Sequence, residues 1–461
     1  MHDIESATNN PTRREFLKQS GAAAAAATTL AGLAVPHVHA AENNLLQVAL
    51  IGCGGRGTGA AADALSVRRG PTKLVALADV FEGRVKGSYN NLKNRFGDQV
   101  DVPEERQFAG FDGYQKAMDC LRPGDIAISA SPPAFRWAHF DYAVDKGLHI
   151  FMEKPLTADG PTSRRMLEIG KRAKEKNLKV GVGLMSRHAR NIEQLNQRVR
   201  DGAIGDIYHM RAYRMHGPIG SVFTDRWTGS PSELHWQIQR FHAFLWASGG
   251  GFNDFYIHVI DHCCWMKDAW PVKAQALGGR HYRGNAVDQN FDSYAVEYTF
   301  ADGAKLYLHG RCMPGAHANF SSYLHGTQGC AIASRSGDCG APSSMYEGQN
   351  FDSGRRIWQS EIPSGEGNPY QNEWNDLVDA IRDDQPFDEW DYGVMASVVS
   401  SLGRRAAHTA RELTLDEVLN CDQEFAPGLD EWTEDSPAPI QADEDGRYPI
   451  PQPGLLTDRE Y

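Results

Sequence analysis

A glycine-rich turn follows a short apolar run near residue 50. Residues 47–57 read QVALIGCGGRG, so Gly52, Gly54 and Gly57 have the spacing G-x-G-x-x-G. A strand that enters such a turn and continues as a helix places backbone N–H groups, at the positive end of the helix dipole, beside a pyrophosphate. The alanine-rich stretch 58–65 suits that helix. The turn therefore predicts a dinucleotide site, with a turn in an unrelated α/β domain as the alternative.

A second apolar run, residues 73–78, ends in Asp79, 22 residues after the last glycine of the turn. A carboxylate at this place can accept hydrogen bonds from an adenosine ribose. Its charge would repel a 2′-phosphate, and Val80 rather than an arginine follows it. The pattern favours NAD and makes NADP the less expected cofactor, although Arg84 lies close along the chain.

Two further groups have the residue types for acid–base chemistry. Lys154 lies in the tripeptide Glu153-Lys154-Pro155, and Asp254 and His258 are four residues apart. On a helix, that spacing puts the carboxylate and the imidazole on one face. An imidazole can take a proton near neutral pH, and an ammonium favours negative charge that develops on an alcohol oxygen. The alternatives are a surface lysine and a core histidine with its hydrogen bonds satisfied.

The elements that must position these groups alternate along the chain. Strand-like runs lie at 48–51, 74–78, 126–129 and 149–152, with helix-like stretches at 111–120 and 134–146 between them. This alternation predicts a doubly wound parallel sheet of the Rossmann type, in which ligands lie beyond the carboxyl ends of the strands. After residue 205, strand-like segments and Gly-containing turns predict a second α/β domain with an open, largely antiparallel sheet.

These patterns divide the chain into four expected parts. Residues 45–160 form the NAD(P)-binding domain, 161–420 the substrate and oligomerisation domain, and 421–461 an acidic, Pro-rich arm or disordered tail. Residues 1–40 resemble a twin-arginine signal, because a pair of arginines precedes an alanine-rich run that ends in a small-residue cleavage site. A disordered basic N-terminus is the alternative. The signal implies the export machinery as a partner, a periplasmic or exported protein, and a nucleotide that is loaded before export and then retained.

Charge and cysteine spacing exclude some classes of protein. The net charge is −12, and residues 421–461 alone contribute −9 with 11 acidic and 2 basic residues. The net charge of the rest of the chain is also negative, which argues against nucleic acid binding because that function needs a basic face. No two of the eight cysteines form a C-x-x-C pair, which disfavours a zinc ribbon or a thioredoxin-like motif. Cys330 and Cys339 could close a small loop in an oxidising compartment.

Two longer stretches carry a family resemblance. Residues 128–157, ISASPPAFRWAHFDYAVDKGLHIFMEKPLT, and 248–266, SGGGFNDFYIHVIDHCCWM, resemble the glucose–fructose oxidoreductase / inositol dehydrogenase / rhizopine-catabolism (Gfo/Idh/MocA) family. With the glycine turn, the motifs lie in order over about 220 residues. The resemblance implies an NAD(P)-dependent dehydrogenase acting on a secondary hydroxyl of a sugar, cyclitol or related polyol. It also implies a dimer or tetramer that uses the open face of the second sheet.

The resemblance assigns roles to individual residues. The catalytic residues fall on Lys154, Asp254 and His258. The residues expected to bind the cofactor are Gly52, Gly54, Gly55, Arg56, Gly57, Asp79, Ser131, Pro132, Glu153 and Lys154. The sequence departs from the common family pattern at Arg136, where many relatives carry histidine.

The sequence leaves the roles of several residues, and two alternative functions, open. Arg187 and Tyr213 could contact the substrate or be structural. Asp261 and His262 extend the Asp254–His258 face and could bind a metal, but hydride chemistry needs none and we predict no metal site. Two other functions compete with a dehydrogenase. One is an NAD-dependent glycoside hydrolase that oxidises the sugar ring transiently, eliminates the aglycone and restores the ring. The other is a non-catalytic sugar-binding protein.

Overall fold

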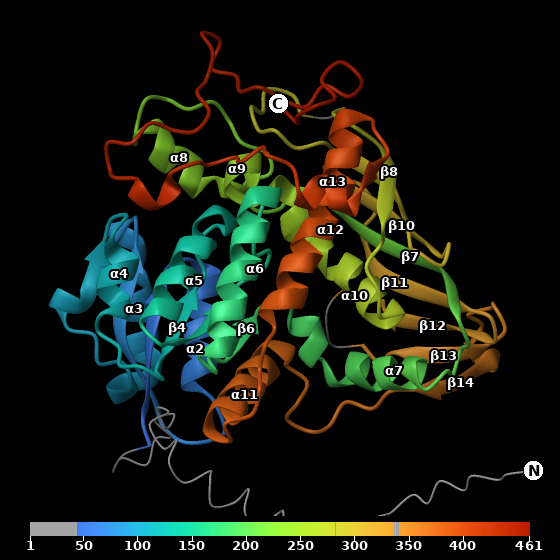
Figure 1. The fold of residues 1–461 in the computed structure, drawn as a ribbon, viewed down its shortest axis with the longest axis horizontal. Helices are drawn as coiled ribbons and strands as arrows, with labels where there is room; N and C mark the ends of the chain where they lie inside the picture. The colour runs from blue at the N-terminus through green and yellow to red at the C-terminus, as the bar shows by residue number, and fades with distance from the viewer. Residues whose placement is uncertain (1–43, 282, 336, 338–340) are drawn as a thin grey trace, which may run out of the picture. The chain divides into compact units, whose positions relative to one another are not determined.

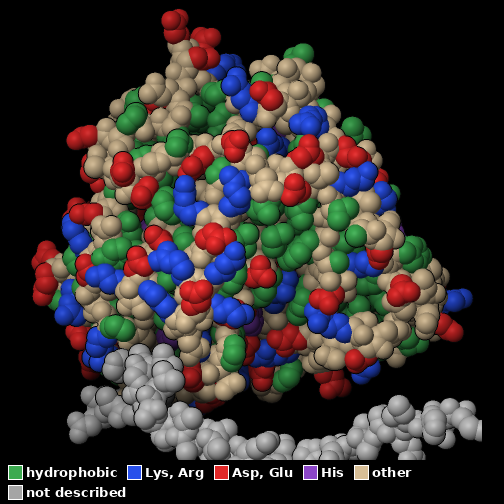
Figure 2. All heavy atoms as spheres, viewed as in Figure 1, with side chains coloured by type: hydrophobic (Ala, Val, Ile, Leu, Met, Phe, Trp, Pro, Cys, Tyr) green, Lys and Arg blue, Asp and Glu red, His purple; other side chains and the backbone are tan. Residues whose placement is uncertain are grey.

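The computed structural model describes residues 44–281, 283–335, 337 and 341–461. Residues 43–461 form one compact unit. The expected signal at 1–40 and Cys339 lie outside the described residues. Within the described ranges, no helix combines the length and the apolar character that a bilayer crossing requires. On the face shown in Figure 2, acidic and basic side chains are interspersed.

The N-terminal half is built on a six-stranded parallel sheet. Its strands are β1 (Leu46–Ile51), β2 (Thr72–Asp79), β3 (Gln107–Ala109), β4 (Ile126–Ser129), β5 (His149–Met152) and β6 (Val180–Val182). They lie in the order β3-β2-β1-β4-β5-β6, and every neighbouring pair is parallel. The chain winds outward from β1 and then crosses back to β4, so the switch point lies between these two strands. This order confirms the predicted Rossmann sheet.

Helices cover both faces of this sheet, as the almost continuous burial of its strands requires (Figure 1). They are α2 (Gly55–Leu65), α3 (Glu82–Phe96), α4 (Gly113–Met118), α5 (Arg136–Asp145), α6 (Gly160–Glu175) and α11 (Pro369–Arg382). The last of these comes from far along the chain. Trp374, Leu377 and Val378 of α11 share one apolar cluster with the alanines of α2 and with β1. A late segment therefore completes the dinucleotide-binding half.

The second sheet has nine strands. They are β7 (Ile207–His216), β8 (Lys273–Gly279), β9 (Ser293–Thr299), β10 (Lys305–Cys312), β11 (Asn319–Gly326), β12 (Gly329–Ser334), β13 (Ser344–Glu347), β14 (Arg356–Gln359) and β15 (Leu413–Thr414). Their order is β14-β13-β12-β11-β7-β10-β9-β8-β15. The pair β7–β10 is parallel and the other neighbours are antiparallel, which confirms the open, largely antiparallel sheet. Alternating burial along β10 shows that one face is packed and the other is open.

Three helices cover the packed face of the second sheet: α7 (Arg190–Arg200), α10 (Ile257–Lys267) and α12 (Trp390–Thr409). Helix α12 also packs on α6 and β6, so it joins the two halves. Its small residues permit this close approach. A Cβ at Gly393 would lie 3.0 Å from Leu156 and Val182, and one at Gly403 would lie 2.0 Å from the Tyr298 hydroxyl. One continuous apolar core therefore connects both sheets.

Residues 421–461 form an arm that Figure 1 shows beside α8 (Glu233–Gln239) and α9 (Leu245–Ser248). Its apolar side chains Phe425, Leu429 and Tyr448 pack into one cluster with those two helices. The end of the arm is anchored by Glu460, which is 1% exposed and accepts two 2.9 Å hydrogen bonds from the Arg404 guanidinium of α12. Most of the arm has neither helix nor strand, as its proline content predicts.

Candidate active site

The glycine turn joins β1 to α2 and is shaped by close backbone contacts. Gly52 has φ +93°, and a Cβ there would lie 2.6 Å from the backbone of Ala130 and Ser131. A Cβ at Gly57 would lie 1.9 Å from the Gly52 carbonyl oxygen. A Cβ at Gly54 would have no neighbouring atom within 4 Å, so the backbone is open on that side. Since no side chain caps the start of α2, its first N–H groups are available to an anion.

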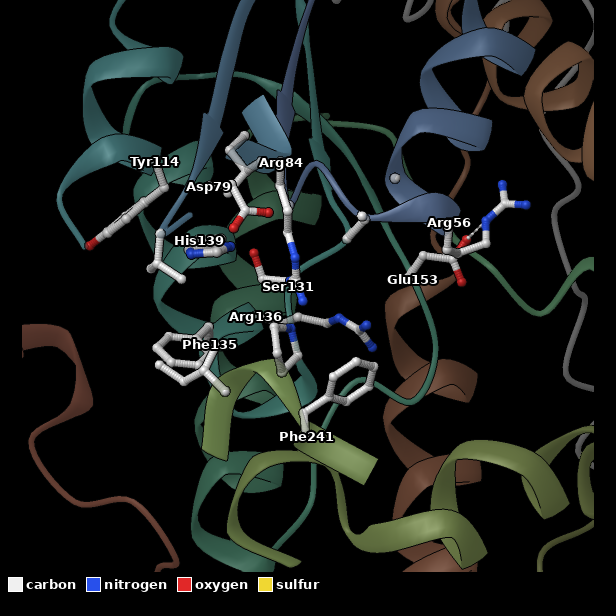
Figure 3. Close-up of a pocket in the computed structure, with 18 of the residues that line it drawn as sticks. Arg56, Asp79, Arg84, Tyr114, Ser131, Phe135, Arg136, His139, Glu153 and Phe241 are labelled. Carbon is white, nitrogen blue, oxygen red and sulfur yellow. Dashed lines mark ion pairs between the residues drawn. The ribbon is translucent and has the colours of Figure 1, made fainter. Parts of the chain in front are cut away.

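A cleft of about 500 Å³ opens beyond the carboxyl ends of β1, β2, β4 and β5. Its volume is in the range of natural cofactor sites. The structure brings together on its walls all ten residues that the sequence assigns to the cofactor. The opposite wall comes from the second half of the chain, through Ile238, Phe241, His242 and Asp254. Figure 3 shows Phe241 of this wall together with Ser131 and Arg136 of the first half. The fold therefore places the predicted dinucleotide cradle against residues that carry acid–base groups.

Asp79 lies at one end of the cleft, at the last position of β2. One carboxylate oxygen accepts a 2.7 Å hydrogen bond from the Cys53 N–H, and the other a 3.0 Å bond from the Phe81 N–H. Burial raises the pKa of this carboxyl group, and these bonds to its ionised form work in the opposite direction. Arg84 also lines the cleft, and its guanidinium lies 4.6 Å from the centre of the Phe81 ring. A carboxylate and a guanidinium thus lie at the same end of the cleft.

At the other end of the cleft, the chain leaves β5 through Glu153 and Lys154. Glu153 is 3% exposed, and its carboxylate lies 2.7 Å from the Arg56 Nε, so it ties this turn to the start of α2. The Lys154 ammonium donates a 2.9 Å hydrogen bond to the Asp254 carbonyl oxygen and lies 3.7 Å from the Asp254 Oδ1. Although burial alone would raise the pKa of Asp254, Lys154 and then His242 hold it well below its usual range. The carboxylate is therefore ionised next to the ammonium.

Asp254 and His258 lie on two kinds of helix. A π-helical turn, Phe252–Tyr256, carries Asp254, and His258 is the second residue of α10. Asp254 lines the cleft, whereas His258 lies outside the set of lining residues and is 7% exposed. Burial, together with the Lys154 ammonium, holds the pKa of His258 well below its usual value. Its Nδ1 has no hydrogen-bond partner among the described residues. His258 is thus an uncharged imidazole within the electrostatic reach of Lys154.

His242 was missed by sequence reasoning. It belongs to the 3₁₀ turn Phe241–Ala243 and lines the cleft. Its Nε2 lies 3.2 Å from the Asp254 Oδ2. No motif surrounds it, and α9 lies between it and Asp254 along the chain, so only the folded chain reveals the pair.

Arg136 is a buried residue of the cleft wall. It is 4% exposed, and its guanidinium donates to the Pro155 carbonyl oxygen. Burial lowers the pKa of Arg136 to about 10, against the attraction of Glu153 and Asp254. An arginine at this position therefore holds the turn after Lys154 in place and adds a cation to the cleft wall.

The structure places neither Arg187 nor Tyr213 in the cleft. Arg187 donates to both carboxylate oxygens of Asp261, at 2.9 and 2.8 Å, and its guanidinium lies 3.8 Å from the centre of the Tyr392 ring. This ion pair commits Asp261 to a structural contact. Tyr213 points to the open face of the second sheet, where its ring stacks on His309 at 5.6 Å, because strand alternation turns it away from α10.

Comparisons with known proteins bear on both halves of the chain. Residues 192–332 match the family model of the GFO/IDH/MocA C-terminal domain. The rhizopine catabolism protein MocA of Rhizobium meliloti is 23% identical over 230 residues, which are 49% of this chain and 64% of that protein. The D-glucoside 3-dehydrogenase of Escherichia coli (strain K12) is 25% identical over 196 residues, 41% of this chain and 50% of that protein. The chain thus spans less than two thirds of the length of these relatives.

Among solved structures, a levoglucosan dehydrogenase in complex with NADH and levoglucosan has a TM-score of 0.60 with this chain. The match covers 80% of this chain and 99% of that chain at 18% sequence identity. Similarity at this level establishes a shared fold.

Proposed function

We propose that this chain is a GFO/IDH/MocA oxidoreductase that transfers hydride between a nicotinamide cofactor and a secondary hydroxyl of a sugar, cyclitol or related polyol. The observation that carries the proposal is the cleft, which has a dinucleotide cradle at one end and the Lys154–Asp254 pair at the other. The names of the relatives, a glucoside dehydrogenase and a levoglucosan dehydrogenase among them, support the substrate class.

The residues present fit this chemistry. The bound nicotinamide would supply the hydride acceptor. The Lys154 ammonium can donate to the reacting hydroxyl oxygen and stabilise the negative charge that develops there. His258 is uncharged, so it can take the hydroxyl proton directly or through one water. Asp254 holds Lys154 at the cleft and supplies the counter-charge.

A substrate screen tests this function. The full-length protein is incubated with NAD and a panel of sugars, glycosides and cyclitols, and reduced nicotinamide is followed by absorbance while any released aglycone is assayed. We expect nucleotide reduction with at least one polyol. Aglycone release without net nucleotide reduction would establish the glycosidase instead, and binding of a sugar with neither change would establish a binding protein.

We further propose NAD rather than NADP as the cofactor. The ionised form of Asp79 accepts ribose hydroxyls and repels a 2′-phosphate, whereas Arg84 on the same wall attracts one. Because Asp79 sits at the strand end with both oxygens held by backbone N–H groups, it decides the preference. Titration of the nucleotide-free protein should show tighter binding of NAD than of NADP. Asp79→Ala should reduce the difference between the two affinities, because it weakens the binding of NAD alone.

We propose that the nucleotide stays bound after export. The arm supports this, because Trp432 packs on Phe135 of the cleft wall and on Trp246 of α9, at 6.3 and 5.6 Å between ring centres. These contacts hold both walls of the cleft together. Protein isolated from the periplasm and denatured should release one nicotinamide nucleotide per chain. Replacement of Arg13 and Arg14 by lysine should keep the protein in the cytoplasm.

We also propose a homo-oligomer that buries the open face of the second sheet. A groove of about 440 Å³ crosses this face between β8, β9 and β10, and Leu277 beside it is 78% exposed. An antiparallel sheet that is covered by helices on one face and has exposed apolar side chains on the other offers a suitable surface for a second copy of the chain.

A further inference from the structure

Asp254 is shared between two partners in the cleft. Its Oδ1 lies 3.7 Å from the Lys154 ammonium, and its Oδ2 lies 3.2 Å from the His242 Nε2. Asp254 itself is only 7% exposed. A buried carboxylate of this kind is stable only if its lone pairs are used. The second partner, His242, is therefore as much a part of the carboxylate's environment as the lysine.

The hydrogen bonds of His242 define which nitrogen carries the proton. Its Nδ1 lies 3.4 Å from the backbone nitrogen of Ser221 and 3.2 Å from the Ser221 Oγ. A backbone N–H can only donate, so Nδ1 accepts and the hydrogen of the neutral ring is on Nε2. That hydrogen points at the Asp254 Oδ2. The imidazole therefore acts as a donor to the carboxylate.

The surrounding chain holds the imidazole in this orientation. Its ring stacks on Phe255 at 5.2 Å, with 18° between the two planes. Gly220 has φ +56°, and a Cβ there would lie 2.7 Å from the His242 Nδ1. Asn290 donates a 2.9 Å hydrogen bond to the His242 carbonyl oxygen. Such support on the ring and on the backbone is what a group needs to aim a hydrogen bond accurately.

We propose that His242 is a positioning residue of the reaction: by donating from Nε2 to Asp254, it holds that carboxylate turned toward Lys154 and so fixes the ammonium that receives the substrate hydroxyl. The inference rests on the proposed function and adds to it a residue outside the Lys154–Asp254–His258 set. It also explains the path of the chain at 241–243, whose turn closes the cleft opposite the nucleotide cradle.

Three variants of His242 separate this role from a merely structural one. Glutamine keeps an N–H donor near the Nε2 position, asparagine keeps one only near Nδ1, and alanine keeps neither. We expect H242A and H242N to lower kcat about 10- to 100-fold, the rate equivalent of one hydrogen bond to a charged group, and H242Q to recover to within about threefold. Nucleotide affinity should change less than threefold in all three. An H242Q as impaired as H242A, or an H242A with normal kcat, would overturn the proposal.

A double-mutant cycle tests whether His242 acts through Asp254. In a D254A background, H242A should change kcat by less than about threefold, because the partner of the hydrogen bond is already gone. An undiminished effect of H242A in that background would show that the imidazole acts independently, and the proposal would fall.

The proposal and the proposed function can fail separately. Nitrogen NMR of the full-length protein at pH 8, without substrate, should show a protonated Nε2 and an unprotonated Nδ1 for His242, and D254A should shift the Nε2 signal. If no polyol reduces the nucleotide but this tautomer is found, the function is wrong and the pairing is right. A protonated Nδ1 with a bare Nε2 would overturn the pairing whatever the enzyme does.

Discussion

Burial acts differently on the two acid–base residues of the cleft region. Burial and then the Lys154 ammonium lower the pKa of His258 and outweigh the opposite influence of the Asp254 carboxylate, so its imidazole is uncharged. Asp254 is also buried, but Lys154 and His242 supply enough positive charge and hydrogen bonding to keep it ionised. One group is therefore prepared to take a proton and the other to hold a cation. Environments that separate two titrating groups in this way are typical of acid–base sites.

The first prediction follows from these charge states. Lys154→Ala and His258→Ala should each lower kcat by roughly 10²- to 10⁴-fold, because each removes a group that acts on the reacting hydroxyl. Nucleotide binding should change far less, since the glycine turn and Asp79 are untouched. Stopped-flow turnover and nucleotide titration on the same samples check both parts. A variant with near-normal turnover would remove its residue from the mechanism.

The sequence predicted the site residues whose geometry depends on local structure. The turn at Gly52, Asp79 at the end of β2 and Lys154 after β5 all follow from a strand and the few residues beyond it. His242 could not be predicted, because its contact with Asp254 depends on how the chain turns back after α9. Tyr213 was placed on the open face by strand alternation, and the sequence does not reveal which face of the strand is packed.

At the scale of elements, the strand pattern predicted both sheets but not how the late helices α11 and α12 pack between them. Helix α11 returns to cover the first sheet after eight of the nine strands of the second sheet, and its cluster with α2 is a contact across about 300 residues. Nothing in a local pattern specifies such a return. The junction between the two sheets, where α11 and α12 meet the first sheet, also contains His188. Its Nδ1 lies 2.8 Å from Asp376 of α11, and its Nε2 lies 2.9 Å from Glu389 at the start of α12.

The second prediction concerns this junction. Although burial alone would lower the pKa of His188, Glu389 and Asp376 raise it to about 10, against about 6.5 in an unfolded chain. The folded state binds the proton more tightly, so the stabilisation is complete below pH 6.5 and is lost as pH rises toward 10. It amounts to roughly 4–5 kcal/mol at most. His188→Gln should therefore lower the melting temperature strongly at pH 6 and much less at pH 10.

Melting curves of the wild type and of His188→Gln from pH 6 to pH 10 test this prediction. The control is His317→Gln, which changes an exposed histidine and should leave the melting temperature of the wild type unchanged at each pH. An equal loss of stability by His188→Gln at both pH values would mean that the ring acts by packing rather than by its charge.

The third prediction concerns the arm. Trp432 packs on Phe135 of the cleft wall and on Trp246 of α9, at 6.3 and 5.6 Å between ring centres. Trp432→Ala removes the contacts that join the arm to both walls, so the bound nucleotide should leave about ten times faster, the equivalent of 1.4 kcal/mol. Release can be followed by trapping free nucleotide. Glu434→Gln weakens only a half-exposed ion pair and should leave the release rate almost unchanged.

At the scale of the whole molecule, the two sheets differ in how they are covered. Helices pack on both faces of the first sheet but on only one face of the second. The open face carries the stacked rings of Tyr213 and His309 and the exposed Leu277. Exposed apolar side chains on an open sheet face favour a protein partner, and we propose a second copy of this chain.

The last prediction tests that surface. Leu277→Glu places a charge on the wall of the groove, and burying it in a symmetric interface would bury one unpaired charge from each copy. Light scattering should therefore give a dimer or tetramer for the wild type and a single chain of about 51 kDa for the variant. Leu455→Glu, at an 84% exposed leucine of the arm, is the matched control and should keep the wild-type mass. A wild type that is already monomeric would overturn the oligomer proposal. An L277E that still assembles would place the interface elsewhere, because an unpaired buried charge costs more than most interfaces can offset.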